Sequence, residues 1–96
     1  MTAAVPPQGF AIPLDELELG AKARVAGIDW DTLEPAEANR LRHFGFDEGV
    51  SVEALHRGPF GRDPMAIRVG RMTVAIRRRH AGAVRVVPLA QLSPAR

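Results

Sequence analysis

Five short stretches of alternating apolar and polar residues constrain this chain more than any other feature. Between residues 65 and 69, for example, Met65, Ile67 and Val69 occupy every second position. A period of two places successive side chains on opposite faces of a β-strand. The pattern therefore predicts strands at 21–28, 50–57, 65–69, 72–77 and 83–89.

The links between these stretches favour one bent antiparallel sheet. Gly70-Arg71 is a two-residue link with glycine first, as a type II′ hairpin turn requires. Short strands limit their exposed edges when the sheet curves toward closure. We expect a mainly β fold, a small and partly open barrel of about five antiparallel strands, with a short helical insertion after the first strand.

The inserted helix is predicted from residues 31–46. Its apolar residues include Leu41 and Phe44, three positions apart on one face. Gly45 suits the left-handed position that ends many helices, and Phe46 would then contact Leu41. The sequence thus predicts both the helix and its ending.

Length and proline placement predict one domain with two loose ends. The chain has 96 residues, and residues 1–13 hold three of its eight prolines without any periodicity. We expect a flexible N-terminal arm at 1–13, the domain at 14–88 and a C-terminal tail at 89–96.

Composition narrows the class of protein. The chain has no cysteine, which excludes disulfides and thiolate metal sites and suits a reducing compartment. It contains no apolar run of the roughly 20 residues that a membrane helix needs, and its N-terminus lacks the basic start of a signal peptide. We expect a soluble, cytoplasmic protein.

The sequence gives no support to catalysis or to a bound metal. Ser51 and Ser93 have no motif that places a base beside them. His43, His56 and His80 have no second ligand at a metal-binding spacing within one regular element. The prediction is a protein that is not an enzyme and that has neither a cofactor nor a metal site.

Charge is divided unevenly along the chain. Residues 1–55 carry four basic and ten acidic residues, whereas residues 56–96 carry nine arginines and one acid. Arg68, Arg77 and Arg85 fall opposite the apolar stripes and could share a face, and Arg77 begins a run of three arginines. Such residues either form an ordinary solvated face or bind an acidic partner through arginine–carboxylate contacts.

Four short motifs follow one another along the chain: L-x-x-L-x-x-G, R-L with G-F-x-x-G, a loop of the P-x-G-D-P type, and A-I-R. The matching residues are Leu14, Leu17 and Gly20, then Arg40, Leu41, Gly45, Phe46 and Gly49, then Pro59, Gly61, Asp63 and Pro64 with Arg62 as an extra residue, and finally Ala75, Ile76 and Arg77. This ordered set resembles the ferrous iron transport protein A (FeoA) family over about residues 14–88. The chain departs from the family at Arg79, His80 and Ala81, where glutamates are frequent, and in its N-terminal arm.

The resemblance implies an SH3-like barrel and a cytoplasmic accessory role in ferrous iron transport. The implied partner is the ferrous iron permease FeoB, whose cytoplasmic portion carries a GTPase domain. The family is also associated with transition-metal binding, and the same barrel resembles the C-terminal domain of metal-dependent repressors of the diphtheria toxin repressor type.

The stretch "GPFGRD" at 58–63 is interpreted as a strand connection. It lacks the lysine and hydroxyl of a phosphate-binding loop. Such loops border a peptide groove in SH3-like barrels, so Phe60 is either a partner contact or a core residue. The predicted partner-binding residues are Phe60, Arg62, Arg68, Arg77, Arg78 and Arg79.

Three alternatives to the accessory role stay open. A sequence pI of about 10.4 fits a small barrel that binds nucleic acid, although the chain has few aromatic residues for stacking on bases. The three histidines leave room for direct transition-metal binding. Exposed edge strands could also pair between chains to form a weak homo-oligomer.

Overall fold

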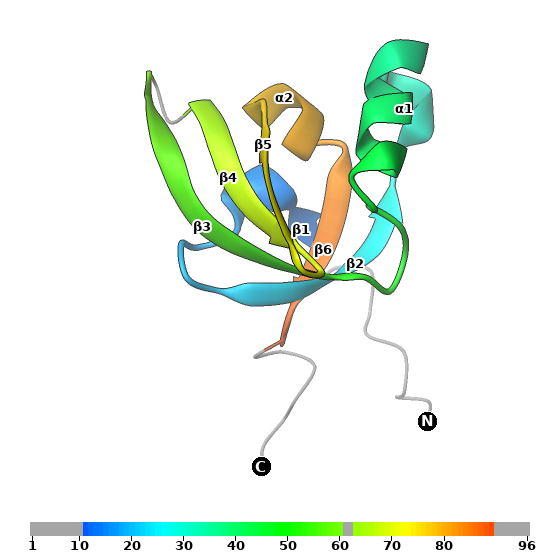
Figure 1. Cartoon of the computed structure of the whole chain (residues 1–96). Helices are drawn as coiled ribbons and strands as arrows, with labels where there is room; N and C mark the ends of the chain where they lie inside the picture. The colour runs from blue at the N-terminus through cyan, green and yellow to red at the C-terminus, as the bar shows by residue number, and fades with distance from the viewer. Residues whose placement is uncertain (1–10, 61–62, 90–96) are drawn as a thin grey trace, which may run out of the picture.

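One strongly curved antiparallel sheet forms the body of the molecule (Figure 1). The computed structural model describes residues 11–60 and 63–89, apart from the side chains of Pro59 and Phe60. Within that part of the chain the sheet has six strands in the order β1-β6-β2-β3-β4-β5. The strands are β1 Ile12–Pro13, β2 Lys22–Ile28, β3 Ser51–Phe60, β4 Asp63–Val69, β5 Met72–Ile76 and β6 Val84–Pro88.

The sheet does not close, which confirms the predicted partly open, mainly β barrel. The strand not predicted is β1, where Ile12 pairs with Val86 and Pro13 with Arg85. Two residues are too short to show an alternating pattern, and they fall within the stretch assigned from the sequence to the N-terminal arm. The stretch 58–63, predicted as a loop between two strands, is largely strand: Gly58–Phe60 continue β3, and Asp63 begins β4 and pairs with Phe60.

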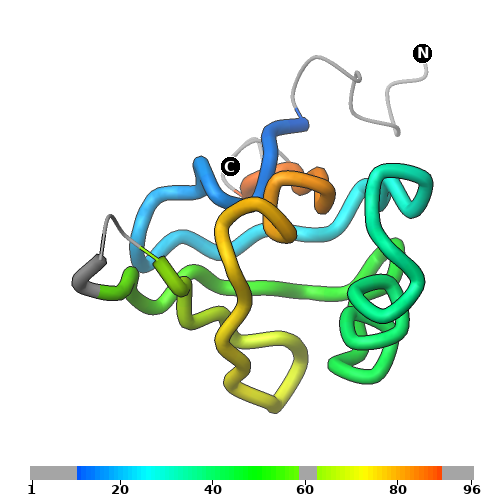
Figure 2. Tube along the Cα trace, turned by 90° about the horizontal axis from the view of Figure 1, so that it is seen from above, coloured from blue at the N-terminus to red at the C-terminus, as the bar shows by residue number. Residues whose placement is uncertain are grey.

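Four short helical elements accompany the sheet in the described residues. They are the 3-10 turns η2 Leu14–Glu16 and η3 Trp30–Thr32, and the α-helices α1 Pro35–His43 and α2 Arg78–Ala81. Helix α1 and the far end of the β3–β4 hairpin lie at opposite ends of the sheet (Figures 1 and 2). Helix α2 packs against η2 and β4. No helix in the described ranges is long and apolar enough to cross a membrane.

The core lies on the concave side of the sheet. Met65, Ile67 and Val69 of β4 are buried, as their alternation predicted. Met72, Val74 and Ile76 occupy alternate positions of β5, as predicted, and Met72 pairs with the buried Val69. Met72 itself is nevertheless 47% exposed. It is the first residue of an edge strand and has a neighbouring strand on one side alone. The β4–β5 turn is as predicted, with glycine at a φ of 59°.

Helix α1 ends as its sequence predicted. The backbone N–H of Gly45 donates to the carbonyl of Arg42 at 3.0 Å, and that of Phe46 donates to the carbonyl of Leu41 at 3.0 Å. Gly45 has a φ of 95°, so these two bonds form a Schellman ending. Leu41 is 1% exposed and Phe46 is 2% exposed. This ending fixes the helix to the core.

Candidate partner-binding surface

The four described residues among the six predicted to contact a partner lie on different elements. Arg68 is exposed on β4, and Arg77 is exposed at the residue before α2. Arg78 and Arg79 belong to α2 itself. The side chain of Phe60 and all of Arg62 lie outside the described residues, so their role stays a prediction.

Two arginines of the run hold α2 against other elements. The guanidinium of Arg78 lies 3.7 Å from the carboxylate of Asp15 in η2, and the guanidinium of Arg79 lies 3.3 Å from that of Glu37 in α1. The backbone N–H of Arg78 also donates to the Asp63 carboxylate at 2.9 Å. Arg78 and Arg79 therefore stabilise the packing of α2 within the molecule.

His80 completes the contact between α2 and α1. It is buried, and its Nε2 lies 2.8 Å from Oε2 of Glu37. Desolvation raises the pKa of the Glu37 carboxyl, but His80, the backbone N–H of Glu34 and the charge of Arg79 together hold that pKa below its usual 4.5. Glu37 is therefore ionised and holds His80 and Arg79 of α2 against α1.

Arg85 is also engaged within the molecule. Its guanidinium lies 3.2 Å from the Asp29 carboxylate. Strands β2 and β3 separate β6, which carries Arg85, from β4, which carries Arg68. The sheet therefore does not bring these two arginines together.

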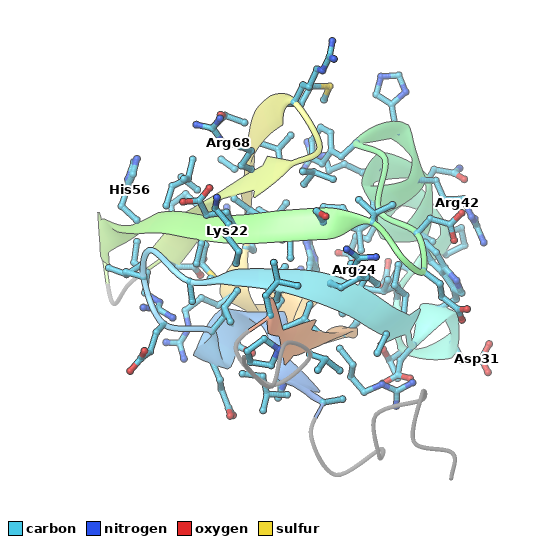
Figure 3. The ribbon with its side chains drawn as sticks, turned by 90° about the horizontal axis from the view of Figure 1, so that it is seen from below. Lys22, Arg24, Asp31, Arg42, His56 and Arg68 are labelled. Carbon is cyan, nitrogen blue, oxygen red and sulfur yellow. The ribbon has the colours of Figure 1, made fainter. Side chains whose placement is uncertain are left out.

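A different set of basic residues gathers on the outer side of the sheet. Lys22 and Arg24 of β2 are exposed and alternate with the buried Ala23 and Val25. In the strand register Lys22 is the direct partner of Glu53 in β3, and Glu53 is the direct partner of Arg68 in β4. Figure 3 shows Lys22, Arg24 and Arg68 on the same side of the molecule. We call Lys22, Arg24, Glu53 and Arg68 the basic sheet face.

The cations of this face form no ion pair within the described part of the chain. None of the ion pairs found there involves Lys22, Arg24 or Arg68. A shallow groove of about 310 Å³ opens beside them, and its lining includes Lys22, Ser51, Glu53 and Arg68. The groove of the basic sheet face is therefore lined by two positive charges, Lys22 and Arg68, and by the carboxylate of Glu53, while Arg24 lies on the same strand as Lys22.

Lys22 and Arg24 of the basic sheet face were not among the candidate site residues predicted from the sequence. Their alternation with apolar residues did predict that they face outward. What it could not predict is that β2 lies beside β3 and β3 beside β4, which places Lys22 and Arg68 on either side of Glu53.

A second shallow groove, of about 580 Å³, has a different character. Apolar residues such as Leu17, Pro88 and Leu89 line it, together with Glu16 and Glu18. It has two carboxylates where the first groove has one, so it is less suited to an acidic partner.

The histidines do not assemble a metal centre in the described residues. No group of three or more histidine, aspartate or glutamate side chains there could hold a metal ion. His80 faces Glu37, and their neighbour Arg79 carries a positive charge that opposes a bound cation.

The curved six-stranded sheet, with the basic face on its outer side, is the architecture of a small SH3-like domain. Comparison with known proteins identifies the family. The family model described as FeoA domain matches residues 12–88. The chain therefore belongs to the FeoA family, which is associated with ferrous iron transport.

Solved structures agree with this assignment. The FeoA protein of Chlorobium tepidum is 32% identical, with 82% of this chain and 71% of that chain covered and a TM-score of 0.72. The zinc complex of Stenotrophomonas maltophilia FeoA is 36% identical, with 76% and 86% covered and a TM-score of 0.65. That protein is described as a prokaryotic SH3 domain protein and a suggested activating factor of ferrous iron transport.

The fold extends beyond transport proteins. A manganese-dependent transcriptional repressor is 23% identical, with 88% of this chain and 43% of that chain covered and a TM-score of 0.72. At this identity the likeness concerns the fold alone. A comparison with curated proteins gives no match.

Proposed function

We propose that this protein is a cytoplasmic accessory protein of ferrous iron uptake, not an enzyme, that binds the cytoplasmic portion of the permease FeoB and modulates transport or its GTPase. The observation that carries the proposal is the FeoA domain over residues 12–88. The relative from Stenotrophomonas maltophilia, suggested to activate ferrous iron transport, supports it.

The surface of the chain is compatible with a binding role. Arg68 and Arg77 are exposed, and neither takes part in an ion pair within the described residues. Arginine suits such a role because its planar guanidinium makes paired hydrogen bonds to carboxylates. Both residues are therefore proposed contacts, together with Phe60 and Arg62.

The proposal is tested by the rate of GTP hydrolysis of the purified cytoplasmic portion of FeoB from the same organism, with and without this chain. We expect the rate to change with a saturable dependence on the concentration of the chain. A rate that is unaffected, together with no detectable complex, would remove the basis of the proposal.

Arg78 and Arg79 are unsuitable positions for testing the surface by charge reversal. Arg78 and Arg79 contact Asp15 and Glu37, so reversing them would disturb the packing of α2 as well as the surface charge. Reversal of Arg68 or Arg77 changes exposed charges without breaking an ion pair of the described residues.

A further inference from the structure

We propose that the basic sheet face is the docking surface for FeoB, and that it recognises a row of acidic, basic and acidic side chains on that partner. This inference rests on the proposed function and adds where the partner binds and what chemistry it presents. The residues that carry it are Lys22, Glu53 and Arg68, with Arg24 beside them.

Most other basic side chains near the sheet already stabilise the fold. One guanidinium nitrogen of Arg57 donates to the backbone oxygens of Asp15 at 3.0 Å and Leu17 at 2.7 Å. Arg85 pairs with Asp29, and Arg42 lies 4.2 Å above the ring of Trp30. The basic sheet face lacks such contacts within the described residues, so its charges are available to a partner.

The register places the charges in an ordered row. Lys22, Glu53 and Arg68 are direct cross-strand partners on β2, β3 and β4. Side chains in such positions have Cβ atoms about 4.5–5.5 Å apart, so the row covers roughly 10 Å. The exposed neighbours Ser51 and Thr73 are small, which lets another surface approach the charged groups.

The sign pattern favours an acidic protein surface over nucleic acid. Glu53 lies at the centre of the row, where it would repel a phosphate backbone that is negative along its whole length. A protein can instead place a lysine or arginine opposite Glu53 and carboxylates opposite Lys22 and Arg68. Trp30, the single tryptophan of the chain, is covered by Arg42 and lies on η3, away from this row.

The test measures the dissociation constant of the complex between the full chain and the cytoplasmic portion of FeoB for four proteins: native, Arg68→Glu, Glu53→Gln and Arg40→Glu. Arg40→Glu is the matched control, because Arg40 is exposed on α1 and its reversal changes the net charge equally. Thermal melting of each variant verifies that it folds.

We expect Arg68→Glu to weaken binding by about tenfold or more, because like charges brought together at an interface are costly. Arg40→Glu should change binding by less than about threefold, as for an isolated surface charge. Glu53→Gln should also weaken binding, since it removes the partner of a basic residue on FeoB. Binding of the same proteins to a fluorescent oligonucleotide, a polyanion, is measured for comparison with their binding to FeoB.

The outcomes separate the two proposals. No binding by the native chain overturns both the proposed function and this inference. Native binding with equal affinity of Arg68→Glu and Arg40→Glu keeps the function and overturns the docking surface. If Glu53→Gln binds FeoB more tightly than the native chain does, the acidic–basic–acidic row is overturned. The row is also overturned if the chain binds the oligonucleotide more tightly than FeoB and Glu53→Gln strengthens that binding.

Discussion

Replacing Gly58 by alanine is expected to destabilise the β3–β4 hairpin. A Cβ atom at this position would lie 2.6 Å from the backbone oxygen of Asp63 and 2.9 Å from that of Pro64. Both atoms belong to the backbone of the neighbouring strand, so no side chain can turn aside to make room. The two strands would have to move apart at this point.

The size of the effect follows from two opposing terms. Inserting a methyl group into a well-packed site costs about 1–3 kcal/mol, and alanine recovers about 0.4–1 kcal/mol by restricting the unfolded chain. The net loss in the free energy of unfolding is therefore about 1–2 kcal/mol, which lowers Tm by about 4–16 °C in a domain of this size.

Gly82→Ala is the matched control for this substitution. Gly82 has a φ of −64° and a ψ of −20°, which any residue adopts, and its Cβ would meet its nearest neighbour at 3.6 Å. We expect Tm to be unchanged or slightly raised. Thermal unfolding followed by circular dichroism measures both variants. A Gly58→Ala variant as stable as the native chain would refute the close approach of β3 and β4.

Three further predictions concern helix α1 and its contacts. Leu41→Ala should lower the free energy of unfolding in urea by about 2–5 kcal/mol, because Leu41 is 1% exposed and belongs with Phe46 to the buried core; a loss below about 1 kcal/mol would contradict this packing. The pKa of Glu37 is lowered in the folded chain, so its stabilising effect is present above the usual pKa of 4.5 and is lost as pH falls through the lower, folded-state value. Glu37→Gln should therefore show a shallower fall of Tm below pH 4.5 than the native chain, and identical slopes would argue against the contact. Arg42→Ala should change the fluorescence of Trp30 and cost about 0.5–1 kcal/mol, and unchanged emission would mean that the 4.2 Å stacking does not persist in solution.

Local signals account for the parts of the fold that the sequence predicted. The alternation of Met65, Ile67 and Val69 needs no knowledge of the rest of the chain, and it matches their burial in β4. The ending of α1 depends on a glycine and a phenylalanine that follow the helix directly, and both of its hydrogen bonds are present. The exposure of Met72 could not be predicted, because the same alternation does not reveal which strand lies at an edge.

The candidate site depends on contacts between distant residues, which periodicity does not show. Arg79 pairs with Glu37 across 42 positions of the chain, so an arginine run that suggested a binding surface is partly used to hold α2. The row formed by Lys22, Glu53 and Arg68 arises from pairing three strands. Its members were visible in the sequence, but their adjacency was not.

Isothermal titration calorimetry measures directly whether this chain binds the cytoplasmic portion of FeoB. The native chain is titrated into that portion at low and at physiological salt, with the nucleotide-free, GDP-bound and GTP-analogue-bound forms. We expect a saturable isotherm in at least one form, with weaker binding at higher salt because charged surfaces meet. The absence of binding heat in every form, with no complex by size-exclusion chromatography, would contradict this expectation.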